Sequence, residues 1–270
     1  MKSPLSILYL LIPIALFIGA CNNKQSSSNN NNQEDFNSDY SIADSSYKII
    51  SETWHSDYFV GRELQDSTVV KASYPKFQQQ WINALINEHF FENAEPEHLA
   101  NGFILGFDEF VEDMGVENVR FPWMLSREVN IAGNLGQVLV LKNKFYEFTG
   151  GAHGNYYSQY LNIDMHNQQA IALKDLIQHG KQPTLLETAE QLFRDQEGLT
   201  ANEPFGEGYF FHDGQFSLPE TFHFESDALV FTYHVYAIKP YSEGETELKI
   251  PFKEIQQVLT DYALELIDTF

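Results

Sequence analysis

Residues 123–164 read WMLSREVNIAGNLGQVLVLKNKFYEFTGGAHGNYYSQYLNID, and three runs within this stretch are rich in apolar and β-branched side chains. The runs cover residues 123–132, 137–148 and 156–164. Apolar side chains that alternate with polar ones are typical of strands with one buried face. Gly133-Asn134 is a suitable tight turn between the first two runs. The stretch therefore predicts an antiparallel meander.

Strands and helices are also expected before this meander. Residues 47–50 and 68–74 have the β-branched and aromatic content of strands, and Pro75 is expected to end the second of them. Large apolar residues then recur at helical spacing over residues 77–91 and 97–114. We expect the aromatic stripes of these two segments to lie in the core.

The second half of the chain repeats this mixture of elements. Residues 173–177 and 184–196 are predicted to be helical, and Gly198 is placed to end the second helix. Residues 221–225 and 229–236 predict a hairpin around Ser226-Asp227, followed by a strand at 245–250 and an amphipathic helix from 252 to the C-terminus. Because strands and helices are segregated, the predicted fold class is α+β, with antiparallel β-sheets packed against amphipathic helices. We expect two consecutive modules, residues 40–150 and 151–270.

The N-terminus has the pattern of an export signal. An apolar stretch follows Lys2, and small residues lead to Cys21, the single cysteine of the chain. This order resembles a bacterial lipobox, which implies a signal peptide at residues 1–20 and lipidation of Cys21. The alternative is an apolar segment that stays in place as a membrane anchor. Residues 21–39 are rich in Ser and Asn and predict a flexible spacer, so the expected location is the cell envelope, facing the periplasm or the cell exterior.

The charge of the chain limits its partners. Its formal net charge is −22, with 38 acidic and 16 basic residues. Such a surface repels nucleic acid, which we exclude as a partner, and attracts cations or cationic proteins. A plainer interpretation is that the acidity confers solubility.

The most distinctive motif is the glycine-rich run at residues 149–155. Its candidate ligand-binding residues are Gly150, Gly151, His153, Gly154 and Asn155. Three glycines within five residues permit positive φ angles and a close approach of the backbone. The loop can present His153 and backbone amides to a ligand, or it can be a tight turn whose histidine satisfies a buried backbone group. It lacks the following helix and the Lys-Ser or Lys-Thr pair of a nucleotide-binding loop.

No residue is assigned a catalytic or metal-binding role. The chain has no nucleophile motif, and the evenly spaced His212, His223 and His234 do not have the spacing of a metal-ligand set. The acidic cluster at residues 108–113 is expected to be the solvated face of a helix. We therefore expect no cofactor.

Several segments together resemble a known family. They are residues 149–155, 161–164 and 171–177, then 237–244 with Pro240-Tyr241, and 248–252. They are similar to a paired-domain family of unknown function in bacterial envelope proteins. The same modules form the extracellular part of lysozyme-sensing anti-sigma factors of the RsiV type and precede the catalytic domain of peptidoglycan deacetylases of the PdaC type. The resemblance implies an α+β receptor-like module that recognises lysozyme or cell-wall glycan; the signalling and deacetylase roles are not carried over.

The expected function is thus a non-enzymatic, lipid-anchored envelope protein that binds a lysozyme-like muramidase or peptidoglycan. Trp54, Tyr58 and Trp123 are candidates for stacking on sugar, although each also suits the core. One alternative is a hydrolase or deacetylase of cell-wall glycan that uses His153. Another is a structural partner in an envelope assembly.

Overall fold

The computed structural model describes residues 46–201 and 203–270. The expected signal peptide, the lipidation site Cys21 and the spacer lie outside the described residues. Within the described ranges, no helix is long and apolar enough to cross a membrane.

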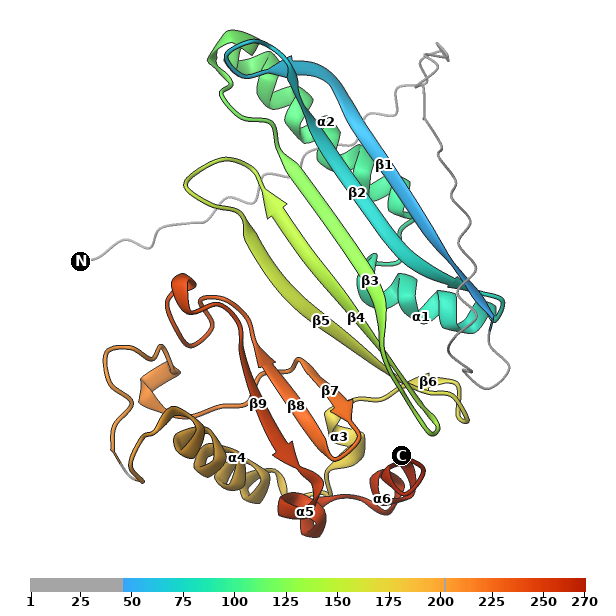
Figure 1. Ribbon diagram of the computed structural model, residues 1–270, viewed down its shortest axis with the longest axis vertical. Helices are drawn as coiled ribbons and strands as arrows, with labels where there is room; N and C mark the ends of the chain where they lie inside the picture. The colour runs from blue at the N-terminus through green and yellow to red at the C-terminus, as the bar shows by residue number, and fades with distance from the viewer. Residues whose placement is uncertain (1–45, 202) are drawn as a thin grey trace, which may run out of the picture.

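The larger of two sheets contains the predicted meander (Figure 1). Its strands, in spatial order, are β1 (Tyr47–Val60), β2 (Asp66–Phe77), β3 (Met124–Leu135), β4 (Val138–Phe148), β5 (Asn155–Asp164) and β6 (Gln169–Ala170). Neighbouring strands are antiparallel except β2 and β3, which are parallel. The parallel pair arises because α1 (Gln80–Phe90) and α2 (Pro96–Met114) supply the long connection that parallel strands need.

These two helices cover one face of the larger sheet. Ile82, Ile86 and Phe90 of α1 are buried against Leu139 and Leu141 of β4 and their neighbours. Helix α2 lies over β1 and β2, and short turn η1 (Val116–Asn118) follows it. This arrangement confirms the α+β fold class and places most of the helical apolar stripes in the core, but Phe110 and Met114 of α2 are exposed.

The aromatic stripe of α2 encloses Trp123. The rings of Phe103, Phe107 and Phe110 lie 5.6, 5.7 and 5.6 Å from it. The opposite side of α2 exposes three of the four acidic residues of the 108–113 cluster, as expected. Asp108 is half-buried and accepts a hydrogen bond from the Ser56 hydroxyl.

Two local predictions in the larger sheet are wrong. The β3–β4 turn is predicted at Gly133-Asn134 but lies at Gly136-Gln137. Strand β3 continues past Gly133, with a β-bulge between Ile131 and Gly133. Gly136 has φ +54°, and a Cβ there would lie 2.1 Å from the Thr269 hydroxyl oxygen, so only glycine fits. Strand β2 also continues through Pro75, since its pairing with β3 covers only residues 69–73 and leaves that side without a neighbour.

The smaller sheet has its own helices. It contains β7 (Phe222–Glu225), β8 (Ala228–Tyr233) and β9 (Thr246–Pro251), all antiparallel. Around it lie α3 (Leu173–Leu176), α4 (Gln182–Glu197), α5 (Phe252–Ile255) and α6 (Asp261–Ile267), with the short turns η2 (His212–Gly214), η3 (Tyr241–Glu243) and η4 (Gln256–Val258). The hairpin at Ser226-Asp227 and the end of α4 at Gly198 are confirmed.

The C-terminal segment is not the single helix that its pattern predicts. The chain breaks between α5 and α6 because Leu259 forms a β-bridge with Ile177. The Thr260 N–H donates to the Leu176 carbonyl at 2.9 Å, and the Thr260 hydroxyl caps α6 by accepting from the Ala263 N–H. Pairing with residues 176–178 therefore replaces continuous helix.

Asn162 joins the two sheets. Its side-chain amide donates to the Phe222 carbonyl at 2.9 Å and accepts from the Phe224 N–H at 3.2 Å, so it acts as a neighbouring strand for β7. Val138 and Val140 pack into the apolar core of the smaller sheet, on the face of the larger sheet away from α1. The larger sheet continues across residues 150 and 151, the expected module boundary, and ends with β6. The division into two modules stays a prediction.

Candidate functional site

The glycine-rich run forms the β4–β5 loop, and the β8–β9 connection extends from the smaller sheet toward it (Figure 1). Gly150 and Gly151 have φ angles of +109° and +97°, a region that favours glycine. A Cβ on Gly154 would lie 2.5 Å from the Tyr146 ring. The loop thus uses both properties expected of its glycines, and Asn155 is the exposed first residue of β5.

His153 is held by neutral groups. Its Nδ1 lies 3.1 Å from the Gly154 carbonyl oxygen, which must accept, so Nδ1 carries the hydrogen. Its Nε2, left as an acceptor, lies 3.2 Å from the Tyr236 hydroxyl. Within the described part of the chain, no carboxylate forms an ion pair with His153. The histidine therefore satisfies a backbone carbonyl, as one interpretation of the sequence has it, and lacks the acid that would orient a general base.

Three tyrosine rings gather near this histidine. We define the aromatic patch as His153, Tyr156, Tyr236 and Tyr241. The Tyr241 ring is central: it stacks on His153 at 3.9 Å and lies 5.3 Å from Tyr236 and 5.6 Å from Tyr156. The Tyr241 hydroxyl also donates to the Gly154 carbonyl at 2.8 Å. The patch thus brings together the glycine-rich run and the Pro240-Tyr241 turn, which lie far apart in the sequence.

Tyr236 is the exposed tyrosine of the aromatic patch, whereas Tyr156 and Tyr241 are half-buried. The Tyr236 side chain is 54% accessible, and its backbone has φ +65°. A non-glycine residue in this region costs on the order of 1–3 kcal/mol and persists only when surrounding structure imposes it. The exposed ring contacts His153 through its hydroxyl and lies beside Tyr241.

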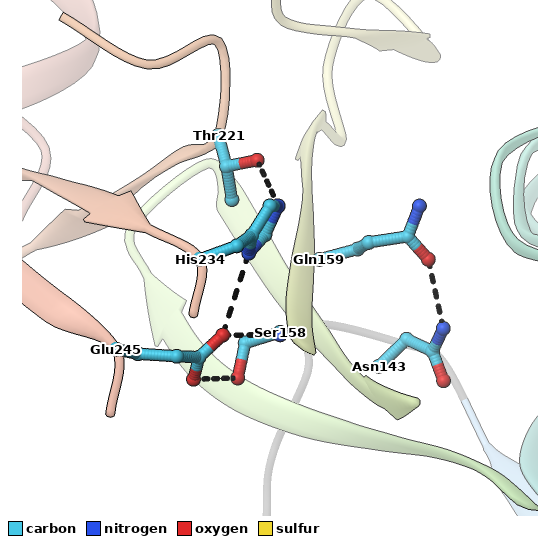
Figure 2. Close-up of polar contacts among 6 residues, drawn as sticks. All are labelled: Asn143, Ser158, Gln159, Thr221, His234 and Glu245. Atoms are coloured by element: carbon cyan, nitrogen blue, oxygen red, sulfur yellow. Dashed lines mark hydrogen bonds and ion pairs between the residues drawn. The ribbon is translucent and has the colours of Figure 1, made fainter. Parts of the chain in front are cut away.

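A polar chain anchors the β8–β9 connection on β5 (Figure 2). The Glu245 carboxylate accepts from the Ser158 N–H at 2.6 Å and from the Ser158 hydroxyl at 2.8 Å. His234 Nδ1 lies 3.4 Å from the same carboxylate, and His234 Nε2 lies 3.3 Å from the Thr221 hydroxyl. Burial raises the pKa of the Glu245 carboxyl, but hydrogen bonds from His234 and Ser158 outweigh this effect and hold the pKa below its usual value.

The order hydroxyl, imidazole, carboxylate is that of an activated nucleophile. Here both contacts of His234 are longer than the 2.6–3.2 Å or so typical of such pairs. The shortest contacts of Glu245 go to Ser158, which shows that the carboxylate caps the outer edge of β5. This arrangement positions the Tyr241 turn against the glycine-rich loop.

The other sequence candidates lie elsewhere. Trp54, Tyr58 and Trp123 pack in the clusters between α2 and the larger sheet. In the described residues, no group of three or more His, Cys, Asp and Glu could hold a metal ion. Sequence reasoning missed the roles of Tyr156, Tyr236, Tyr241, His234 and Glu245. The signal for Tyr241 is the Pro240-Tyr241 run, which belongs to the segments that carry the family resemblance.

Comparison with known proteins identifies the type of domain. Residues 174–253 match a family described as a protein of unknown function, DUF3298. The crystal structure of a DUF3298 family member from Bacteroides fragilis superposes with a TM-score of 0.65 at 21% identity, covering 83% of this chain and 96% of the other. A DUF3298 family protein from Pseudomonas aeruginosa gives a TM-score of 0.60 at 16% identity, covering 80% and 95%. These likenesses show a shared fold over both sheets, and no curated protein matches the chain.

Proposed function

We propose that this chain is a non-catalytic binding protein of the bacterial cell envelope and that its aromatic patch recognises a cationic muramidase of the lysozyme type. The observation that carries the proposal is the aromatic patch itself, whose exposed Tyr236 ring contacts His153 and Tyr241. Tyrosine rings supply large contact area at low entropic cost and are enriched among binding hot spots.

Charge supports a cationic partner. Glu243 is exposed two residues after Tyr241, and Glu147 pairs with Asn155 beside the glycine-rich loop. The chain has a formal net charge of −22, so it attracts a cationic protein over long range. Association of the two should therefore be faster at low salt. The resemblance to the extracellular part of lysozyme-sensing anti-sigma factors supports the same class of ligand.

Calorimetric titration with a chicken-type lysozyme tests the proposal. We expect saturable binding at low salt that weakens at least tenfold in 0.3 M salt, because screening shortens the reach of the surface charges. Tyr236→Ala should weaken binding about tenfold or more. Phe59→Ala is the matched control, since Phe59 is 53% exposed on the larger sheet and lies outside the aromatic patch. Absence of binding at low salt, or equal effects of the two substitutions, would contradict the proposal.

Peptidoglycan glycan is a second candidate ligand, favoured by the exposed ring face of Tyr236, on which a sugar can stack. Sugar stacking does not depend on net charge. Pelleting with purified sacculi that persists in moderate salt and is lost in Tyr236→Ala would select this ligand.

The envelope location rests on Cys21. We propose that the thiol and the new amino group of this residue are acylated after removal of residues 1–20. Mass spectrometry of protein purified from the native host tests this step. An intact, unacylated N-terminus in the cytosolic fraction would refute it.

A further inference from the structure

The register of the larger sheet arranges polar and aromatic side chains in rows on the face away from α1 and α2. Ser126, Tyr146 and Tyr156 are aligned across β3, β4 and β5. In the same way, Glu128, Lys144 and Ser158 form a second row, and Asn130, Lys142 and Tyr160 form a third. These rows alternate with residues such as Leu139, Leu141 and Leu161, which pack under α1.

The smaller sheet covers only part of this face. Tyr160 is buried in the core that the smaller sheet forms with Val138 and Val140. The first two rows, which begin at Ser126 and Glu128, form the floor of a hollow of about 370 Å³, and Glu245 forms one wall. This volume lies in the range of small-molecule sites, about 300–1,000 Å³, and is large enough for one sugar ring.

Two cations line the hollow. Lys142 and Lys144 form no ion pair within the described part of the chain, although the whole sequence has 38 acidic residues against 16 basic ones. Two carboxylates also line the hollow: Glu128 accepts from the Asn130 amide at 2.8 Å, and Glu245 accepts from Ser158. Burial lowers the pKa of Lys142, but contact with the Tyr160 hydroxyl and nearby glutamates outweighs it, so the amine stays charged. The hollow therefore holds two ammonium groups without an ion pair, beside the carboxylates of Glu128 and Glu245, which balance their formal charge.

The hollow also offers aromatic surface and hydroxyls. Tyr146 and Tyr156 are opposite each other on β4 and β5, and both are half-buried. Ser126 lies beside Tyr146 on β3. Aromatic faces beside a few polar groups are the usual composition of a carbohydrate site, because the apolar face of a sugar stacks on a ring while its hydroxyls seek hydrogen bonds.

We propose that this hollow binds a sugar ring that bears a carboxylate, with Lys144 and Lys142 taking the carboxylate and Tyr146 and Tyr156 taking the ring. The two unpaired ammonium groups can donate charge-assisted hydrogen bonds to a carboxylate, which a neutral sugar lacks. The proposal deepens the glycan candidate of the proposed function and does not depend on the muramidase, which would contact the neighbouring aromatic patch.

Titration of ¹⁵N-labelled protein with N-acetylmuramic acid, followed by NMR, tests the proposal. We expect saturable shifts in β3, β4 and β5 with a millimolar dissociation constant. N-acetylglucosamine, which lacks the lactyl carboxylate, should bind at least tenfold more weakly, and so should D-lactate, which lacks the ring. Equal binding of the neutral sugar would overturn the role of the lysines, and equal binding of lactate would overturn the role of the tyrosines.

Substitutions separate this site from the aromatic patch. Lys144→Gln should weaken N-acetylmuramic acid binding five- to tenfold, whereas Lys144→Arg should keep most of it, and both should fold because Lys144 is exposed. Lys253→Gln is the control, since Lys253 is 80% exposed and lies on α5. Lysozyme binding should persist in Lys144→Gln, so loss of sugar binding alone supports the proposal independently of the muramidase. No shifts at 20 mM sugar, or identical behaviour of Lys144→Gln and the wild type, would overturn it.

Discussion

His223 makes the stability of this protein fall in mildly acidic solution. The side chain is 8% exposed on β7 and stacks on the Tyr160 ring at 4.0 Å. Its Nδ1 is buried with no hydrogen-bond partner among the described residues. Burial lowers the pKa of His223 to about 4; Glu225 raises it slightly, and the positive charge of Lys142 lowers it further. The folded state therefore disfavours the charged imidazole.

The sign and size of the effect follow from linkage between protonation and folding. The unfolded chain takes up the proton near pH 6.5, but the folded chain does so only near pH 4. The contribution of neutral His223 is thus fully present above pH 6.5 and is lost as pH falls from 6.5 toward 4. The free energy of unfolding should fall by about 2 kcal/mol at pH 5 and about 3 kcal/mol at pH 4 from this residue alone.

Urea unfolding at a series of pH values measures this loss. Carboxylates that titrate below pH 5, such as Asp164, steepen the acid limb in every variant, so the comparison with His223→Phe isolates the histidine. Phenylalanine keeps the ring stack on Tyr160 and carries no proton. The fall in unfolding free energy between pH 7.5 and pH 5 should be about 2 kcal/mol smaller in His223→Phe than in the wild type.

His212→Gln is the control for removal of a histidine, because the His212 side chain is 96% exposed. This variant should keep the pH dependence of the wild type. If His223→Phe and the wild type lose the same free energy on acidification, the argument from burial is refuted.

Three further substitutions test the fold. Asn162→Ala should lower the free energy of unfolding in urea by about 3 kcal/mol, since it leaves two backbone groups of β7 without partners; Asn130→Ala, at an exposed position, should change it by less than about 0.5 kcal/mol. A similar cost for both would contradict the role of Asn162 as the joint between the sheets. Gly154→Ala should lower the free energy of unfolding by about 1–3 kcal/mol and shift the amide NMR signals of the loop, because the added Cβ would clash with the Tyr146 ring. Gly208→Ala is the control: its added Cβ would have no atom within 4 Å, so the free energy of unfolding should not change. Phe107→Ala should lower the free energy of unfolding by about 3–5 kcal/mol, because it leaves a cavity between α2 and the larger sheet. A loss below about 1 kcal/mol would contradict this and would mean that neighbouring side chains fill the cavity.

Local patterns in the sequence predicted much of the fold. The hairpin at Ser226-Asp227 is determined by its turn residues, and the end of α4 is determined by the left-handed conformation of Gly198. Both effects involve only residues a few positions apart in the sequence. The strands of the meander follow from hydrophobic period alone. These features need no knowledge of distant segments.

The failures share one physical cause, which is contact between segments far apart in the chain. The turn at Gly136 packs against Thr269, whose hydroxyl accepts from the Gln137 N–H, and the C-terminal helix breaks because Leu259 pairs with Ile177. The parallel pairing of β2 with β3 likewise depends on where the intervening helices pack. Local propensity cannot report any of these contacts.

The same limit applies to the candidate site. The glycine-rich loop was recognisable from its composition, but the roles of its partners were not. Tyr236 and Tyr241 reach His153 across the β8–β9 connection, which Glu245 joins to Ser158. A surface assembled from both sheets becomes visible only in the folded chain.

Hydrogen–deuterium exchange with and without a bound lysozyme tests most directly whether the aromatic patch is the recognition surface. We predict slower exchange at residues 149–156 and 236–244 in the complex and unchanged exchange in α2 and at the β1–β2 turn. Protection confined to other segments, or none at saturating lysozyme, would contradict it.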